Sequence, residues 1–248
     1  MTRAACLLPV AFLVALLNFG RSAPVWAVDE CAIAPDLVTL DRPLPETRRR
    51  LAAGLPLKIV AIGTSSTIGM AAGGMEHAFP QRLAIHLQAA LPKEAVTVVN
   101  RGAPRQSAQE MVARFPTDVV AEKPALVIWE VGTNDAVRSV DMDDFSAALQ
   151  SGVDILKAAG IDLLIMDLQF SRSTSSVINF EPYLTTLTRM AEVNDVPVFR
   201  RYDIMRSWDD LGTFDLDESR PAQRTALARK VYDCIGTALA QQIGQAAR

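Results

Sequence analysis

Five short apolar runs alternate with stretches of helical spacing along this chain of 248 residues, and this alternation restricts the fold more than any other feature. The runs are rich in Val, Ile and Leu, which predicts buried parallel strands, at residues 57–63, 96–102, 126–132, 163–168 and 196–199. Apolar residues at helical spacing predict helices at 79–91, 107–114, 143–159, 180–193 and 222–243. Right-handed crossovers between such elements give an α/β fold, a flavodoxin-like doubly wound parallel five-stranded sheet in three α/β/α layers.

Residues 1–27 have the pattern of a secretory signal peptide. Arg3 precedes an apolar stretch, and small residues at Val25 and Ala27 form a cleavage site. The stretch is shorter than the roughly 20 residues that span a bilayer, so we expect cleavage after Ala27 and no stable membrane span afterwards. The protein is then periplasmic or secreted, with a Pro-rich N-terminal strap at 28–56 and one domain at 57–248.

Charge and cysteine content narrow the partners. The net charge of −3 becomes about −5 when the signal is removed, which argues against nucleic acid as a partner. Cys6 lies in the signal, so Cys31 and Cys234 remain as one pair in an oxidising compartment. We expect a disulfide between them, with two buried free thiols as the alternative. They have no cluster of Cys or His companions, and we expect neither a metal nor another cofactor.

Three residues suited to acyl chemistry fall at the ends of the first three predicted strands: Ser65, Gly102 and Asn134. The carboxyl ends of parallel strands meet at one edge of a sheet, so chain order alone predicts that they lie close together. A serine in a strand-to-helix turn suits a nucleophile, and backbone and amide N–H groups suit an oxyanion. Each residue alone has a structural explanation, as a helix cap, a turn glycine or a loop asparagine.

These segments resemble the sequence blocks of the SGNH (GDSL-type) hydrolases, a family of serine esterases. The Gly-Thr-Ser at 63–65 resembles the Gly-Asp-Ser block, with threonine in the aspartate place, and 132–135 matches Gly-x-Asn-Asp. The resemblance covers most of the chain and implies the SGNH hydrolase fold. It also implies hydrolysis of a small-molecule or glycan ester, with Ser65 as nucleophile and an oxyanion hole made by Ser65, Gly102 and Asn134.

The late Asp-x-x-His block of that family has no histidine in this chain. The two histidines, His77 and His86, both lie early in the sequence. We interpret His77 as a solvated loop residue and His86 as a structural residue within a helix. Because a serine hydroxyl needs a base near neutral pH, we expect weak hydrolysis. The alternative is a pseudoenzyme that binds an acylated glycan or envelope component.

Two alignments of the late block are open. One reads residues 217–221 as Asp-x-x-His-Pro, with Arg220 in the histidine place. The other passes through 232–234, which resembles a periplasmic bacterial subset of the family, and puts Gln223 and Ala226 in the aspartate and histidine places. We favour the second slightly. Two acidic residues of this segment are candidates for the missing base: Asp217 and Glu218.

Further polar residues are predicted near the same edge of the sheet. Asp167 and Gln169 end the fourth strand and are expected to point to one side of it, where they line a substrate-binding pocket. Cations and aromatics at 200–208, past the fifth strand, suit an anionic or sugar-bearing ligand.

Glu130 places a charge inside an apolar run. A buried carboxylate is costly unless it is paired, so Glu130 requires a cation. We expect that cation to be Arg101 or Arg105, on the neighbouring strand end.

Overall fold

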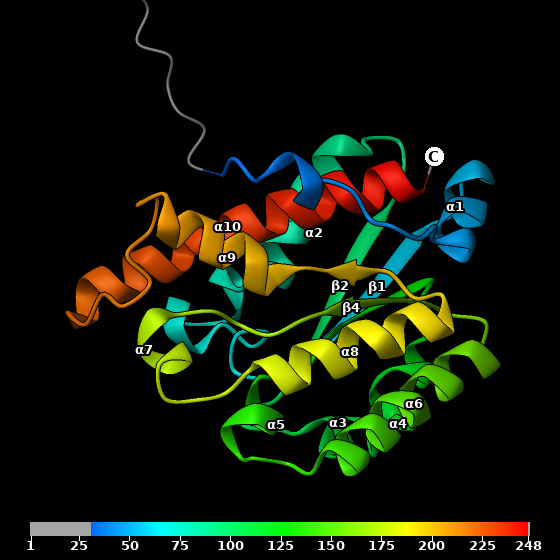
Figure 1. Ribbon diagram of the computed structural model, residues 1–248. Coiled ribbons are helices and arrows are strands. Elements are labelled where there is room, and N and C mark those ends of the chain that lie inside the picture. The colour runs from blue at the N-terminus through cyan, green and yellow to red at the C-terminus, as the bar shows by residue number, and fades with distance from the viewer. Residues whose placement is uncertain (1–30, 248) are drawn as a thin grey trace, which may run out of the picture.

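The computed structural model describes residues 31–247, so the expected signal peptide lies outside the described residues. Five parallel strands form one sheet in the order β2-β1-β3-β4-β5 (Figure 1). Their bounds are β1 Leu57–Gly63, β2 Val96–Gly102, β3 Leu126–Glu130, β4 Asp162–Met166 and β5 Val198–Phe199. The predicted five-stranded parallel α/β fold is confirmed, although β3 ends two residues earlier than predicted.

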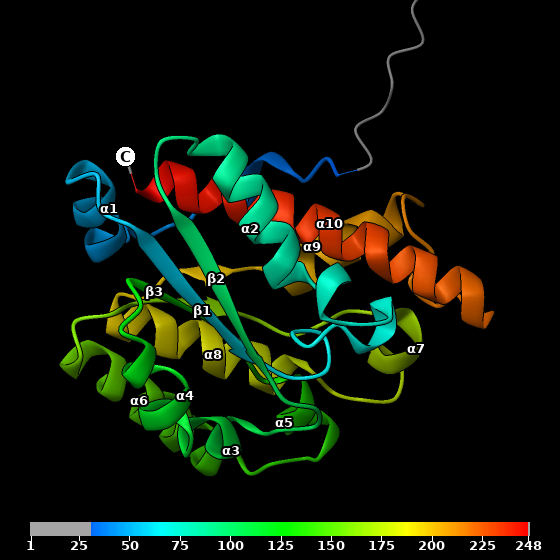
Figure 2. The ribbon, with the colours of Figure 1, turned by 180° about the vertical axis from the view of Figure 1, so that it is seen from behind.

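Ten α-helices accompany these strands in the described part of the chain, and they cover both faces of the sheet (Figures 1 and 2). Alternation along the strands explains why: Ile59 and Ala61 of β1 face one core, whereas Val60 and Ile62 face the other. The first core includes side chains of α2 (Phe79–Ala90), α9 (Arg201–Asp210) and α10 (Pro221–Ala246). The second includes side chains of α3 (Ala108–Val112), α4 (Phe115–Asp118), α5 (Thr133–Val137), α6 (Met142–Ala158) and α8 (Glu181–Asn194).

Five of the ten helices in residues 31–247 were not predicted from the sequence: the short α4, α5 and α7 (Arg172–Ser175), and the longer α1 (Pro45–Ala52) and α9. The expected strap contains α1, which begins with proline at its first position. The N–H groups of Glu46 and Thr47 at this helix start donate to the Asp162 carboxylate at 3.1 and 2.7 Å, so a residue of β4 caps it. The other long unpredicted helix is α9, whose first residue is the buried Arg201. The short helix α7 lies in the connection after β4.

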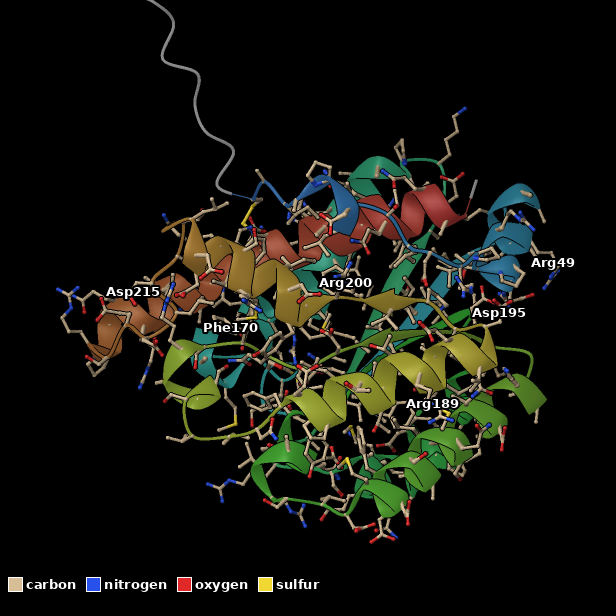
Figure 3. The ribbon with its side chains drawn as sticks, viewed as in Figure 1. Arg49, Phe170, Arg189, Asp195, Arg200 and Asp215 are labelled. Atoms are coloured by element: carbon tan, nitrogen blue, oxygen red, sulfur yellow. A yellow bond between two sulfur atoms is a disulfide. The ribbon has the colours of Figure 1, made fainter. Side chains whose placement is uncertain are left out.

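The predicted disulfide joins Cys31 to Cys234, with their Cα atoms 4.9 Å apart. It is the yellow bond near the start of the blue segment in Figure 3. It ties the N-terminal segment to α10, and the Trp208 indole N–H donates to the Ala32 carbonyl beside it at 2.8 Å. Within residues 31–247, no helix combines the length and the apolar character needed to cross a membrane.

Candidate active site

The turn after β1 presents Ser65 at the carboxyl end of the sheet. Thr64 and Thr67 fix this turn to the end of β3: the Thr64 N–H and the Thr67 hydroxyl each donate to the Glu130 carboxylate at 2.8 Å. The Ser65 carbonyl accepts the Met70 N–H at 3.0 Å, while the Ser65 side chain stays partly exposed. In the described part of the chain, no group hydrogen-bonds to the Ser65 hydroxyl or accepts its N–H. The turn is fixed, and the serine is available to a ligand.

Glu130 is paired with Arg201, not with Arg101 or Arg105, so that part of the prediction is wrong. Arg201 Nη2 lies 3.2 Å from Glu130 Oε1, and both side chains are 1% exposed. Burial by itself would raise the pKa of Glu130, but the Arg201 charge and the hydrogen bonds from Thr64 and Thr67 outweigh it and lower the pKa. Arg201 opens α9, which follows β5 directly, and 71 residues separate the pair in sequence.

The Arg201 guanidinium also joins three segments of the site. Its Nη1 donates to Ser66 Oγ at 3.0 Å, its Nη2 to Thr133 Oγ1 at 3.4 Å, and its Nε to the Leu168 carbonyl at 3.2 Å. Ser66 and Thr133 are the sequence neighbours of the predicted nucleophile and of the predicted oxyanion asparagine. The buried Arg201 side chain therefore connects the three segments that follow β1, β3 and β4. No sequence pattern marked it for this role.

Gly102 and Asn134 lie on segments that hydrogen bonds connect to this turn. A Cβ at Gly102 would lie 2.5 Å from the Ile68 nitrogen, so close packing against the turn requires glycine there. The Gly102 N–H donates to Asn100 Oδ1 at 2.9 Å. The Asn134 amide donates to the Gln106 carbonyl at 3.0 Å, which occupies one of its two hydrogens.

Arg105 lies in the loop between β2 and α3, and no sequence pattern identifies it as part of an oxyanion site. Its φ of 63° lies in the left-handed region, which costs a non-glycine residue about 1–3 kcal/mol. Within residues 31–247, no acceptor binds the N–H groups of Arg105 and Gln106. These two N–H groups belong to the loop after β2, to which the Asn134 amide donates a hydrogen bond. They remain available for an anionic oxygen.

Asp167 and Gln169 do not line one pocket, because they face different cavities. Asp167 lines an open groove of about 840 Å³ beside β5, where its carboxylate accepts the Tyr202 N–H at 2.8 Å. Burial raises the pKa of Asp167 to about 7. Gln169 is exposed, donates its N–H to Thr133 Oγ1 at 3.0 Å, and lines a smaller cavity of about 150 Å³. Of the two, Gln169 lies with the candidate site.

The two acidic candidates for the missing base are engaged elsewhere. Asp217 accepts the Ser173 N–H at 3.1 Å and the Ser173 hydroxyl at 2.5 Å. Glu218 accepts from Nε and Nη2 of the Arg220 side chain and from the Arg220 backbone N–H, and these hydrogen bonds lower its pKa to about 2. A carboxylate with so low a pKa is a poor proton acceptor near neutral pH. Among the described contacts, neither acid reaches Ser65.

The histidine places of both alignments lie on the surface. Arg220 immediately precedes α10 and its side chain is 70% exposed. Gln223 and Ala226 are exposed in the first turns of α10. At 100° per residue, two positions rotate the direction by about 200°, so Ala226 points about 160° away from Arg224, which lines the smaller cavity. Neither alignment therefore directs a side chain toward the turn that carries Ser65 while α10 keeps this helical form.

The two histidines present take no part in this arrangement. His86 lies between α2 and α10, where its Nε2 is 2.8 Å from Asp233 Oδ1 and Arg82 contacts the same carboxylate. His77 is partly buried in a short 3₁₀ turn, and its nearest charged partner is Glu76 at 3.9 Å. Residues 31–247 contain no group of three His, Cys, Asp or Glu side chains that is placed to hold a metal ion.

The sequence pattern of the Non-GDSL lipase-like family matches residues 30–248, the whole of the described structure. The chain belongs to the Non-GDSL lipase-like family. Thr64, which precedes Ser65, donates from its N–H and its hydroxyl to the Glu130 carboxylate of the neighbouring strand β3.

An acetylxylan esterase from Geobacillus stearothermophilus is 33% identical over 75 residues, which are 26% of this chain and 34% of that protein. The match thus spans about a third of the relative's length. The alignment with a solved structure of an acetylxylan esterase from the same organism covers 76% of this chain and 94% of the esterase chain, at 20% identity and a TM-score of 0.59. A two-domain esterase active on acetylated mannans covers 78% of this chain and 54% of its own, at 19% identity and a TM-score of 0.62. These structures show that the fold is shared.

Proposed function

We propose that this protein is a periplasmic or secreted hydrolase of acyl or carbohydrate esters, in which Ser65 is the nucleophile and turnover is slow. The observation that carries the proposal is the Ser65 turn, held rigid by the buried Glu130–Arg201 pair while its hydroxyl and N–H stay available. Membership of a lipase-like family and a fold shared with esterases of acetylated xylan and mannan support the reaction class. The Cys31–Cys234 disulfide supports an oxidising compartment.

In the proposed reaction, Ser65 Oγ attacks the ester carbonyl carbon and the carbonyl electrons move onto the oxygen. The Ser65 N–H and the free hydrogen of the Asn134 amide stabilise this oxyanion. The Gly102 N–H joins them if it leaves Asn100, and the Arg105 N–H is the alternative donor from the same loop. The serine proton passes to water, because no side chain of the described structure takes it, and this makes the first step slow. The intermediate then collapses: the bond from the carbonyl carbon to the alcohol oxygen breaks, and that oxygen takes a proton from water. A second water attacks the acyl-serine, which releases the carboxylic acid and returns a proton to Ser65 Oγ.

Replacing Ser65 by alanine should lower the esterase activity of the mature chain without abolishing it. An oxyanion hole and substrate binding without a working triad retain about 10³–10⁴-fold acceleration over water in other serine hydrolases, so the variant should keep that residual rate and lose only the part that attack by the serine contributes. The measurement is the hydrolysis of p-nitrophenyl acetate and butyrate by both proteins, with Ser176→Ala as a control at an exposed serine. Equal rates for the natural chain and Ser65→Ala would overturn the assignment of Ser65.

A binding protein without catalysis is the second candidate, and the unpartnered Ser65 hydroxyl favours it. One solved variant of the Geobacillus acetylxylan esterase, in which a histidine is replaced by alanine, is described as a catalytic mutant. This chain has no histidine on the late segment. A Ser65→Ala variant that binds acylated oligosaccharide as tightly as the natural chain, together with no Ser65-dependent hydrolysis, would identify the binding protein.

Histidine restored at either aligned place should raise hydrolysis by less than about threefold. A correctly placed base contributes about 10²–10⁴-fold, but Arg220 and Ala226 both point into solvent. The measurement is kcat/KM of Arg220→His and of the double variant Gln223→Asp/Ala226→His, each beside its own Ser65→Ala control. A gain of 100-fold or more in one variant would show that the start of α10 rearranges, and would identify the correct alignment.

A further inference from the structure

A small, mostly apolar cavity lies between α9 and α10, next to Ala71, and is separate from the open groove beside β5. Its volume is about 150 Å³. Its walls come from α9, α10 and the segments that follow β1 and β4; Figure 3 labels Phe170 on the segment after β4. Aliphatic and aromatic side chains make most of the lining: Phe170, Met205, Leu216, Leu227, Val231 and Ile235.

This cavity shares residues with the candidate active site. Arg201 forms part of its wall and donates from Nη1 to Ser66 Oγ at 3.0 Å. Ala71 forms another part, and it directly follows Met70, whose N–H binds the Ser65 carbonyl. These two contacts place the cavity next to the Ser65 turn, with Arg201 shared between the two.

The charges around the cavity suit a neutral, apolar occupant. Glu130 offsets the Arg201 charge inside the protein. Burial raises the pKa of Tyr232, another lining residue, to about 12, so its phenol stays neutral. Arg224 is exposed and supplies a charge only from the surface side of α10. An anionic group inside would meet no uncompensated cation from the buried residues, whereas an alkyl chain would be transferred from water to apolar surface.

We propose that this cavity binds the acyl chain of the ester and selects acyl groups of about four to six carbons over acetyl. The size follows from a known comparison: an apolar cavity of about 150 Å³ accommodates benzene, which has six carbons. The inference rests on the proposed function, because it takes Ser65 as the point where the acyl carbonyl binds. It assigns to this chain an acyl group larger than the acetyl groups named for its structural neighbours.

Binding to the Ser65→Ala chain tests the inference without relying on turnover. Each buried methylene strengthens binding by about fourfold, so methyl hexanoate should bind at least about tenfold more tightly than methyl acetate when titrated by calorimetry or NMR. Equal affinities, or no binding of methyl hexanoate, would overturn the acyl cavity. A chain that binds methyl hexanoate but lacks Ser65-dependent hydrolysis keeps the cavity and loses the hydrolase, so the two failures are distinguishable.

Ala228→Phe, made in the Ser65→Ala background, should remove the preference for methyl hexanoate because Ala228 lines the cavity. The matched control is Ala222→Phe, at an exposed position of the same helix, which should keep it. Leu227→Trp is a second filling variant should Ala228→Phe fail to fold. A preference that survives in a folded filling variant would contradict the proposal.

Discussion

Replacing Arg201 by methionine should lower the free energy of unfolding by about 3–5 kcal/mol. The change leaves the Glu130 carboxylate buried without its cation, and breaking a buried pair at one end carries a penalty of this size. It also removes the hydrogen bonds to Ser66 Oγ and the Leu168 carbonyl. The measurement is urea unfolding followed by circular dichroism, and Ser65-dependent hydrolysis should fall with it because the nucleophile turn loses its support.

Arg206→Met is the matched control on the same helix. Arg206 is 62% exposed and lies 3.6 Å from Asp210, so its loss should change stability by at most about 1 kcal/mol. Equal losses in the two variants would mean that α9 needs arginine for helix formation alone, and that the buried pair has no special weight.

The pH dependence separates an unpaired charge from lost packing. In the natural chain the pKa of Glu130 is lowered, so its contribution to stability is present above the unfolded-state pKa and is lost as the pH falls through the folded-state pKa. Without Arg201, burial raises that pKa, and the variant should lose stability as the pH rises from about 5 to 8. Adding Glu130→Gln should recover part of the loss at pH 8, since the amide can still accept from Thr64.

The sequence predicts the sheet well because each strand is a continuous apolar run, and such a run is typical of a strand buried on both faces. β1 and β2 have the predicted bounds, and α10 differs from its prediction by only a few residues. The sequence does not predict α1, because the group that caps its start is Asp162, more than a hundred residues away. The residues next to one another in sequence indicate which segments are buried and where turns lie. They do not indicate that a residue of a distant strand caps a helix.

The candidate site shows the same division. Strand ends identified Ser65 and Asn134, and hydrogen bonds of their neighbours to Arg201 join their segments. The sequence predicts Arg101 or Arg105 as the partner of Glu130, because it shows which strand ends are neighbours. It does not show which helix packs against those ends, and the partner is Arg201 of α9. The two alignments place the histidine position at Arg220 or at Ala226, and only the structure shows that both residues are exposed at the start of α10.

Replacing Cys31 and Cys234 together by serine should lower the free energy of unfolding by up to roughly 4–5 kcal/mol. The disulfide joins residues 203 positions apart, and in the chain-entropy model a loop of this length restricts the unfolded chain strongly. The measurement is urea unfolding of the mature chain with and without reductant. The natural chain should fall to the stability of the double variant when reduced, while the double variant should not respond to reductant. A change below about 1 kcal/mol would show that the unfolded chain stays compact without the bond.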